Sequence, residues 1–84
     1  MMEKLPRIFF DTNEGWHETG YILRLPCSKV DLSALGSNHL EGMLVTIYMP
    51  NELEMDARLH WDKSLGDWLA RPVKGSIRYL TARD

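Results

Sequence analysis

Few residues of this 84-residue chain have the chemistry to bind a metal ion. The soft metal ligands are three histidines and one cysteine, spread one to a segment: His17, Cys27, His39 and His60. A zinc site visible in a sequence has paired ligands a few residues apart, and none of these four has such a neighbour. The sequence therefore predicts no bound metal and no other cofactor.

The chain also lacks a recognisable catalytic motif. It has no glycine-rich phosphate loop and no nucleophile elbow, and "WHETG" (residues 16–20) shares only a His-Glu pair with the H-E-x-x-H helix of metalloproteases. Glu52, Glu54 and Asp56 share one parity of an alternating segment. On a strand they would point toward water, where their acidity is not tuned for proton transfer. We therefore predict no catalytic residues, and a protein that is not an enzyme.

Length and composition predict one small folded domain. The residues are 44% apolar and 26% charged, which is typical of a globular chain. Eighty-four residues are close to the size at which one hydrophobic core is barely sufficient. No repeat, linker or low-complexity segment divides the sequence. Residues 1–84 are thus predicted to form a single domain, ordered over about residues 5–80.

Charge and targeting signals narrow the expected partners. The net charge is −2 and the basic residues form no run, which disfavours nucleic acid. A single cysteine, Cys27, cannot form an internal disulfide, and the N-terminus has charges and a proline where a secretory signal is apolar. No apolar stretch approaches the roughly 20 residues that cross a bilayer. The sequence predicts a soluble, cytoplasmic protein without a membrane partner.

The apolar pattern of the first half predicts three strands and one helix. The strands are "RIFFDT" (7–12), "GYILRLP" (20–26) and "GMLVTIYM" (42–49), and the third is apolar on both parities, as a strand covered on both faces would be. Between the first two, "NEGWHETG" (13–20) is expected to be a loop. Only "SKVDLSALG" (28–36) has the apolar spacing and end residues of a short helix.

Alternation in "ELEMDARLHW" (52–61) predicts a strand whose registers follow from parity. A three-residue loop, 50–52, with Asn51 or Glu52 in the left-handed conformation, keeps apolar residues on one face. A second hairpin has "DKSLGD" (62–67) as its loop. The cross-strand pairs expected from these two hairpins are Tyr48–Glu54, Thr46–Asp56, Leu44–Arg58, Arg58–Arg71, His60–Leu69, Trp61–Trp68, Leu59–Ala70 and Ala57–Pro72.

A last strand, "SIRYL" (76–80), would continue the apolar side through Ile77 and Tyr79. The resulting fold class is all-β, with about five to six strands and one short helical turn. A sheet of this size with one apolar face most easily buries that face by curling on itself. We expect a small, strongly bent antiparallel barrel or sheet, SH3-like in architecture. An open sheet covered by the short helix is the alternative.

Two readings remain for the charged outer face of this sheet. A solvated strand face is favoured, because soluble sheets commonly place charged residues opposite apolar ones. Leu44 and Tyr48, however, put apolar surface beside an acidic row, a mixture found at protein interfaces. Arg58 and Arg71 repel one another unless a carboxylate bridges them. Glu54, Asp56 or a partner protein could supply that carboxylate.

The three tryptophans are expected to have different roles, some in stabilising the fold and some in contacting a partner. Trp16 either folds back onto the barrel, which is favoured, or contacts a partner. Trp61 and Trp68 are best explained as a cross-strand pair that fixes the hairpin register. If an aromatic groove binds an extended peptide, its expected members are Trp16, Tyr48 and either Trp61 or Trp68.

The function favoured by the sequence is a small protein-interaction or accessory module without enzymatic activity. A homo-oligomeric structural barrel, paired through edge strands, ranks second. A barrel that stacks single-stranded nucleic acid on aromatics ranks third. The residues expected to contact a partner are Trp16, Leu44, Tyr48, Glu54, Asp56, Arg58 and Arg71.

Overall fold

The computed structural model of the chain describes residues 5–36 and 40–80. Its seven strands form one sheet, so the all-β class with one short α-helix is confirmed. The strands are β1 (Arg7–Phe9), β2 (Trp16–His17), β3 (Gly20–Ile22), β4 (Leu44–Met49), β5 (Leu53–Asp62), β6 (Asp67–Pro72) and β7 (Arg78–Tyr79). The helices are η1, a 3-10 turn (Thr12–Glu14), and α1 (Pro26–Ser33). His39 and the residues at the two chain ends lie outside the described residues.

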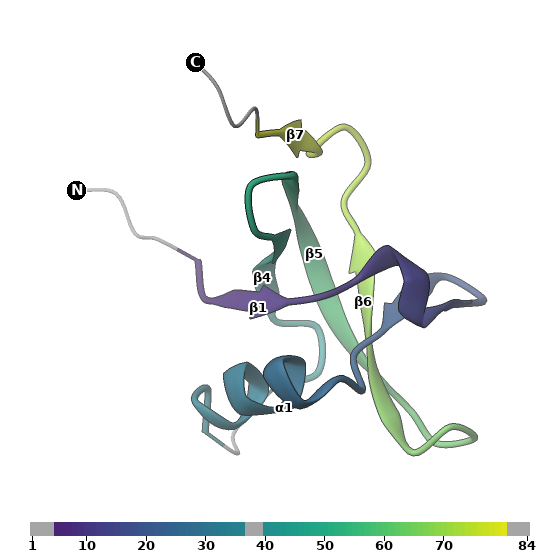
Figure 1. The fold of residues 1–84 in the computed structure, drawn as a ribbon. Helices are drawn as coiled ribbons and strands as arrows, with labels where there is room; N and C mark the ends of the chain where they lie inside the picture. Colours follow the sequence, from purple (N-terminus) through teal and green to yellow (C-terminus); the bar gives the residue numbers. More distant parts are fainter. Residues whose placement is uncertain (1–4, 37–39, 81–84) are drawn as a thin grey trace.

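The sheet has the order β1-β4-β5-β6-β3-β2, and β7 pairs with β5. It is strongly bent: β1 runs across the view of Figure 1 while β5 and β6 run down it, and α1 lies beside β1. Among the described residues β1 and β2 are the two ends of this order and do not pair with each other. Within the described part of the chain, no helix has the length and apolar character needed to cross a membrane.

The expected registers of both hairpins are confirmed. β4 pairs with β5 so that Tyr48 faces Glu54, and β5 pairs with β6 so that Trp61 faces Trp68. Asn51 has the left-handed conformation that the three-residue loop requires, with a φ of 63°. The loop of the second hairpin is shorter than expected, because Asp62 and Asp67 are themselves paired.

The antiparallel expectation is wrong for one pair, since β1 runs parallel to β4. A parallel pair needs a long crossover connection, usually through a helix. The chain supplies one, because α1 lies between β1 and β4 in the sequence. Parity constrained only the later hairpins, so the direction of this N-terminal strand did not follow from the pattern.

The segment 13–20 is not the loop that its composition predicted. It contains the end of η1 and the β2–β3 hairpin, in which Trp16 faces Tyr21. Gly15 has a φ of 119° and Glu18 a φ of 55°, so two left-handed positions make the chain reverse direction within a few residues. The first two strands are correspondingly shorter than predicted.

Helix α1 covers the outer edge of β1. It begins at Pro26 rather than Ser28, because proline fits the first helical position, where no backbone N–H is needed. The buried Ser28 hydroxyl donates to the Phe9 carbonyl, and Asp31 Oδ2 accepts from the Phe9 N–H at 2.8 Å. Two helix side chains therefore satisfy the backbone groups that an edge strand would otherwise leave unpaired.

Strand β7 does not return as a further strand beyond β6. It pairs with β5 at Leu53 and Glu54, while β6 pairs with the other end of β5. In the connection, Ser76 Oγ accepts from the Asp56 N–H at 3.0 Å. The prediction that Ile77 and Tyr79 continue the apolar side is wrong, because both side chains are exposed.

The core lies on the concave face of the sheet and under α1. Its largest fully buried side chains include Phe10, Ile8, Leu23, Ile47 and Leu59. Leu32 of α1 packs against the same cluster, so the helix closes one side of it. Trp68 is only partly buried against this core, at the end of the sheet nearest the β5–β6 loop.

Candidate interaction site

Two grooves flank helix α1, and they have different walls. The first, of about 490 Å³, lies between α1 and the end of the β5–β6 hairpin; we call it the tryptophan cavity. The second, of about 450 Å³, lies between α1 and strands β1 and β4; we call it the tyrosine groove. Both volumes are within the range of pockets that bind small molecules or peptide side chains.

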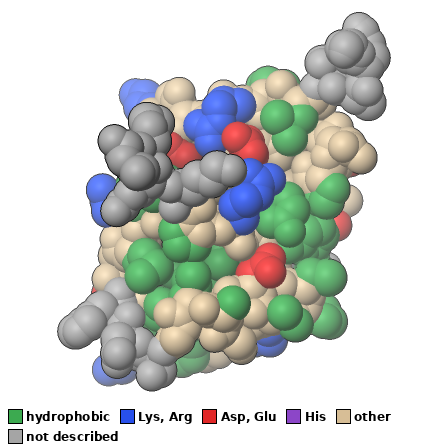
Figure 2. Space-filling view, turned by 90° about the vertical axis from the view of Figure 1, so that its left-hand side faces the viewer, with side chains coloured by type: hydrophobic (Ala, Val, Ile, Leu, Met, Phe, Trp, Pro, Cys, Tyr) green, Lys and Arg blue, Asp and Glu red, His purple; other side chains and the backbone are tan. Residues whose placement is uncertain are grey.

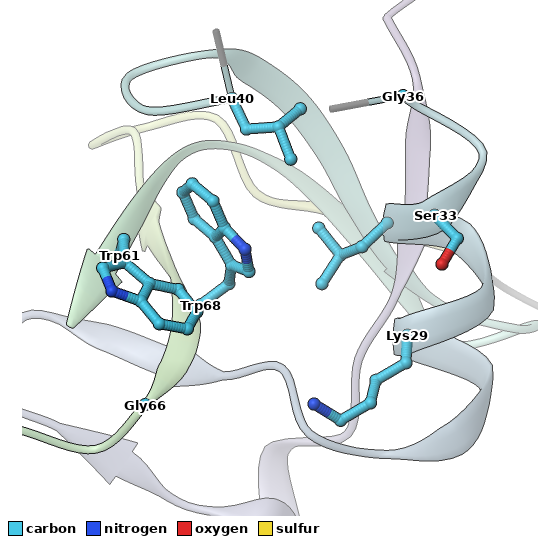
Figure 3. Close-up of a pocket in the computed structure, with 8 residues that line it drawn as sticks. Lys29, Ser33, Gly36, Leu40, Trp61, Gly66 and Trp68 are labelled. Carbon is cyan, nitrogen blue, oxygen red and sulfur yellow. The ribbon is translucent and has the colours of Figure 1, made fainter. Parts of the chain in front are cut away.

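Apolar side chains from three segments line the tryptophan cavity. Leu32 comes from α1, Leu40 from the segment before β4, and Trp61 and Trp68 from the hairpin. Figure 3 shows both indoles and Leu40 pointing toward a common space opposite the helix. The two indole rings meet at 64° with centroids 5.4 Å apart. Trp61 remains 41% exposed, so the part of the chain that the structure describes leaves this end of the sheet open.

Polar groups stand at the rim of the tryptophan cavity. Lys29 reaches toward it from α1 in Figure 3, and its Nζ lies 3.3 Å from Asp67 Oδ1. Arg24 binds the same carboxylate, with Nη2 3.1 Å from Oδ2. Two cations thus share the Asp67 carboxylate. Among the described residues, neither indole N–H of Trp61 and Trp68 has a hydrogen-bond acceptor.

In the tyrosine groove the polar and aromatic groups are already engaged. Its walls include Phe9, Tyr48 and the exposed Val30. The Arg7 guanidinium lies over the Tyr48 ring, 4.5 Å from its centroid, and Phe9 packs edge-on against that ring. Asp31 is held by the Phe9 N–H. The face that carries β1 and α1 shows basic and acidic side chains interleaved beside an apolar area (Figure 2).

The acidic row on the outer face of β5 binds arginines of the same chain. Glu54 contacts Arg7 at 2.9 Å and Arg78 at 3.0 Å, and Asp56 contacts Arg78 at 3.2 Å. The hydrogen bond from Arg7, followed by that from Arg78, lowers the pKa of Glu54, and the carboxylates raise the pKa of Arg78. The Glu54 side chain is 20% exposed, so it is not the freely hydrated acid that alternation predicted. This supports the reading of these acids as an internally neutralised strand face.

Arg58 and Arg71 lie opposite each other as predicted, but neither Glu54 nor Asp56 bridges them. Arg58 instead donates to the Gly42 carbonyl at 3.0 Å. Leu44, the other cross-strand neighbour of Arg58, is half-buried. The Leu44, Tyr48, Glu54, Asp56 and Arg58 face is therefore one continuous surface, with its acids paired within the chain.

Trp16 packs onto the sheet and still exposes about half of its surface. Its ring packs edge-on against Tyr21, with centroids 4.9 Å apart, and its Nε1–H donates to the Glu18 carbonyl at 3.0 Å. It is nevertheless 53% exposed at the end of the sheet. Trp16 and Tyr48 stand in different places, and neither lines the tryptophan cavity.

Comparison with known proteins adds no homologue to this description. No family model, curated protein or solved structure matches the chain. The two grooves and the groups around them are thus the observations from which a function is inferred.

Sequence reasoning favoured a structural role for the Trp61–Trp68 pair and placed one of the two in a possible groove with Trp16 and Tyr48, so it missed a cavity that both indoles line without those two residues. The Trp61–Trp68 pairing is present, yet it also presents both rings to an opening. The signal that could have found it is the position of the pair at the mouth of its hairpin, one residue before the loop. A helix wall opposite it, with Lys29 and Leu32, becomes visible only in three dimensions.

Proposed function

We propose that this protein is a small, non-enzymatic protein-interaction module that binds an extended segment of a partner through the tryptophan cavity. The observation that carries the proposal is the open end of the apolar face, where the described residues leave Trp61 partly exposed beside Trp68. Large aromatic surface in a concave, partly desolvated site is the usual anchor of a protein interface. An apolar side chain of the partner would fill the space between α1 and the hairpin.

The tyrosine groove is the weaker candidate for the same role. Its aromatic ring is covered by Arg7, and its carboxylate, Asp31, is used by the Phe9 backbone. A partner there would have to displace groups that already have good contacts, which costs binding free energy. In the tryptophan cavity, the indole N–H of Trp68 has no acceptor among the described residues, so it can donate to a partner.

The rim charge specifies the partner further. Lys29 and Arg24 both contact the Asp67 carboxylate, so an acidic residue beside the apolar anchor would meet two cationic side chains at the rim. Electrostatic complementarity of this kind sets specificity and association rate more than affinity. We therefore expect a segment with a bulky apolar residue next to Asp or Glu.

A displayed random-peptide library selected against the full chain tests this function. Enriched peptides should share an apolar residue beside an acidic one. Trp61→Ala should weaken the best peptide by about tenfold or more, as expected for an anchor site. Ser33→Tyr, which fills the cavity from an exposed helix position, should do the same without removing a core contact.

Tyr48→Ala is the matched control, since it removes an aromatic ring from the other groove. It should leave the affinity for the peptide within about twofold of the parent. Two results would overturn the proposal: no peptide enriched above background, or peptides whose binding depends on Tyr48 and not on Trp61. Circular dichroism of each variant verifies that the fold is kept.

A homo-oligomer is the second candidate, because two exposed aromatics stand on strands at free edges. Trp16 lies on β2, the last strand of the sheet order, and Tyr79 lies on β7, which pairs only with β5 among the described strands. Edge strands of this kind can pair between chains. Light scattering at high protein concentration should then show a dimer that Trp16→Ser disrupts; a monomer throughout would remove this candidate.

A further inference from the structure

A cluster of potential metal ligands lies where the β2–β3 turn meets the end of β5. His17 Nε2 is 3.4 Å from Asp62 Oδ2 and 3.6 Å from Glu18 Oε2. One ligand atom from each of these residues lies within 4.8 Å of the other two. None of them lines the tryptophan cavity, so this cluster is separate from the proposed peptide site.

The spacing of these atoms suits a bound ion better than it suits direct hydrogen bonds. Charge-assisted hydrogen bonds are about 2.7 to 2.9 Å long. His60, the other described histidine, meets that standard, because its Nδ1 lies 2.8 Å from Glu41 Oε2. His17 stands farther from both of its carboxylates. Ligand atoms placed 2.0 to 2.2 Å from a tetrahedral ion are separated by about 3.3 to 3.6 Å, and the His17–Asp62 and His17–Glu18 distances of 3.4 Å and 3.6 Å lie in that range. The Glu18 and Asp62 ligand atoms lie within 4.8 Å of each other.

The surrounding backbone orients the carboxylate of Asp62 and fixes the main-chain position of Glu18. Asp62 Oδ1 accepts from the Leu65 N–H at 3.0 Å, which turns Oδ2 toward His17. Glu18 sits at a left-handed position of the β2–β3 turn, and its carbonyl accepts the Trp16 indole N–H. Outer contacts that orient ligands are a regular part of metal sites.

We propose that His17, Glu18 and Asp62 bind one divalent transition-metal ion of the zinc class. A neutral imidazole and two carboxylates balance the charge of such an ion, and nitrogen with oxygen ligands is a common zinc set. The Asp62 side chain is 12% exposed whereas Glu18 is 72% exposed, so the cluster is open on one side. That side gives the ion an entry path and a fourth position for water.

This proposal departs from the sequence-based expectation of no metal. The chain has no paired ligand spacing, because the third ligand comes from a distant strand. His17 and Glu18 are the His-Glu pair of "WHETG", and the fold adds Asp62 to them. Proximity of this kind depends on tertiary structure and leaves no local signature.

Titration of the chelator-treated full chain with Co²⁺ and then Zn²⁺ tests the site. We expect one Co²⁺ per chain with the visible absorption of tetrahedral cobalt, lost when Zn²⁺ displaces it. Zn²⁺ should also raise the unfolding temperature, since a ligand that binds only the folded state stabilises it. His17→Gln and Asp62→Asn should each weaken Zn²⁺ binding by more than about tenfold, because even outer partners of metal ligands have effects of that size.

His60→Gln is the matched control, since it removes a histidine that also contacts a carboxylate. It should leave Zn²⁺ affinity unchanged. Asp62→Asn retains an oxygen that can accept from the Leu65 N–H, so it separates loss of a ligand from loss of the turn. The proposal is overturned if the parent binds neither ion, or if His60→Gln weakens binding as much as His17→Gln.

Discussion

The tryptophan cavity and the tyrosine groove lie on either side of one helix, and they differ in how far other groups of the chain already contact their walls. In the tyrosine groove, Arg7 covers Tyr48 and the Phe9 backbone engages Asp31. In the tryptophan cavity, Trp61 is left partly exposed and no described side chain accepts from its indole N–H. Similar volume therefore does not make two equivalent sites.

The difference follows from the backbone groups that border each groove and from whether they already have hydrogen-bond partners. The tyrosine groove borders β1, an edge strand. Its outer N–H and C=O groups would destabilise the folded protein if they were buried without hydrogen-bond partners. Ser28 and Asp31 are present there to pair them. The tryptophan cavity borders the β5–β6 hairpin, where the backbone is already paired around Trp61 and Trp68. Its walls are mainly the side chains of Leu32, Leu40, Trp61 and Trp68, and none of these four is needed to pair the backbone of an edge strand.

The largest expected effect is the difference in stability lost when each of the two tryptophans is replaced by alanine. Trp68→Ala removes a ring that packs on the core and should lower the free energy of unfolding by about 3 kcal/mol. Trp61→Ala removes a more exposed ring and should cost about 1 kcal/mol, chiefly its contact with Trp68. Urea unfolding measures both. Equal losses would mean that Trp61 is held for structure, which would weaken the comparison.

The wall that both grooves share should be the next most sensitive feature. Ser28→Ala leaves the Phe9 carbonyl without its donor in a buried place, and should cost about 2 kcal/mol of unfolding free energy. Ser33→Ala, at an exposed position of the same helix, should change stability by less than about 0.5 kcal/mol. If the two variants unfold alike, α1 is not anchored through Ser28.

The Glu54 ion pairs should show their contribution through pH. Glu54→Gln should cost about 1 kcal/mol at neutral pH, a modest value because both arginine partners are about half exposed. Since Arg7 and Arg78 lower the folded-state pKa of Glu54, its stabilisation is present above the unfolded pKa and is lost as the pH falls through the folded one.

Urea unfolding of the parent and Glu54→Gln between neutral and acid pH measures this loss. The two stabilities should converge in acid, below the ordinary glutamate pKa of about 4.3. Glu52→Gln, an exposed glutamate at the start of the same hairpin arm, is the control and should run parallel to the parent. A gap that stays constant with pH would show that Glu54 acts by packing rather than by charge.

The smallest effect concerns the rim of the tryptophan cavity. Lys29→Gln should change stability by less than about 0.5 kcal/mol, because Arg24 still binds Asp67. It should weaken an acidic selected peptide by about threefold at low salt, and the difference should fade at higher ionic strength. Lys63→Gln, in the hairpin loop, is the control. Equal peptide affinity for both variants would show that the Lys29 charge does not contribute to peptide binding.

Parity predicted the registers of the β4–β5 and β5–β6 hairpins residue by residue. A strand with one buried face cannot slip by a single position without exposing that face, so Trp61–Trp68 and Tyr48–Glu54 were fixed by the sequence alone. The N-terminal third lacked such a constraint. Its short strands owe their pairing to left-handed turns at Gly15 and Glu18 and to the crossover through α1, and none of these follows from an apolar pattern.

The candidate sites were less predictable than the fold, because they join distant segments. The acidic row on β5 was placed correctly, but its arginine partners, Arg7 and Arg78, come from β1 and β7. The tryptophan cavity needs α1 opposite the hairpin. Sequence periodicity states which face a residue occupies; it does not state what lies across from that face.

The most direct test of the central claim is an amide and indole N–H nuclear magnetic resonance titration of the labelled protein with the best selected peptide. We expect the largest chemical-shift changes at the indole N–H groups of Trp61 and Trp68 and at the amide of Lys29. The chemical shift of the Tyr48 amide should not change. If the largest changes occur at Tyr48 and Arg58 and the indole signals do not shift, the proposed site is contradicted. The partner would then bind the charged outer face of the sheet.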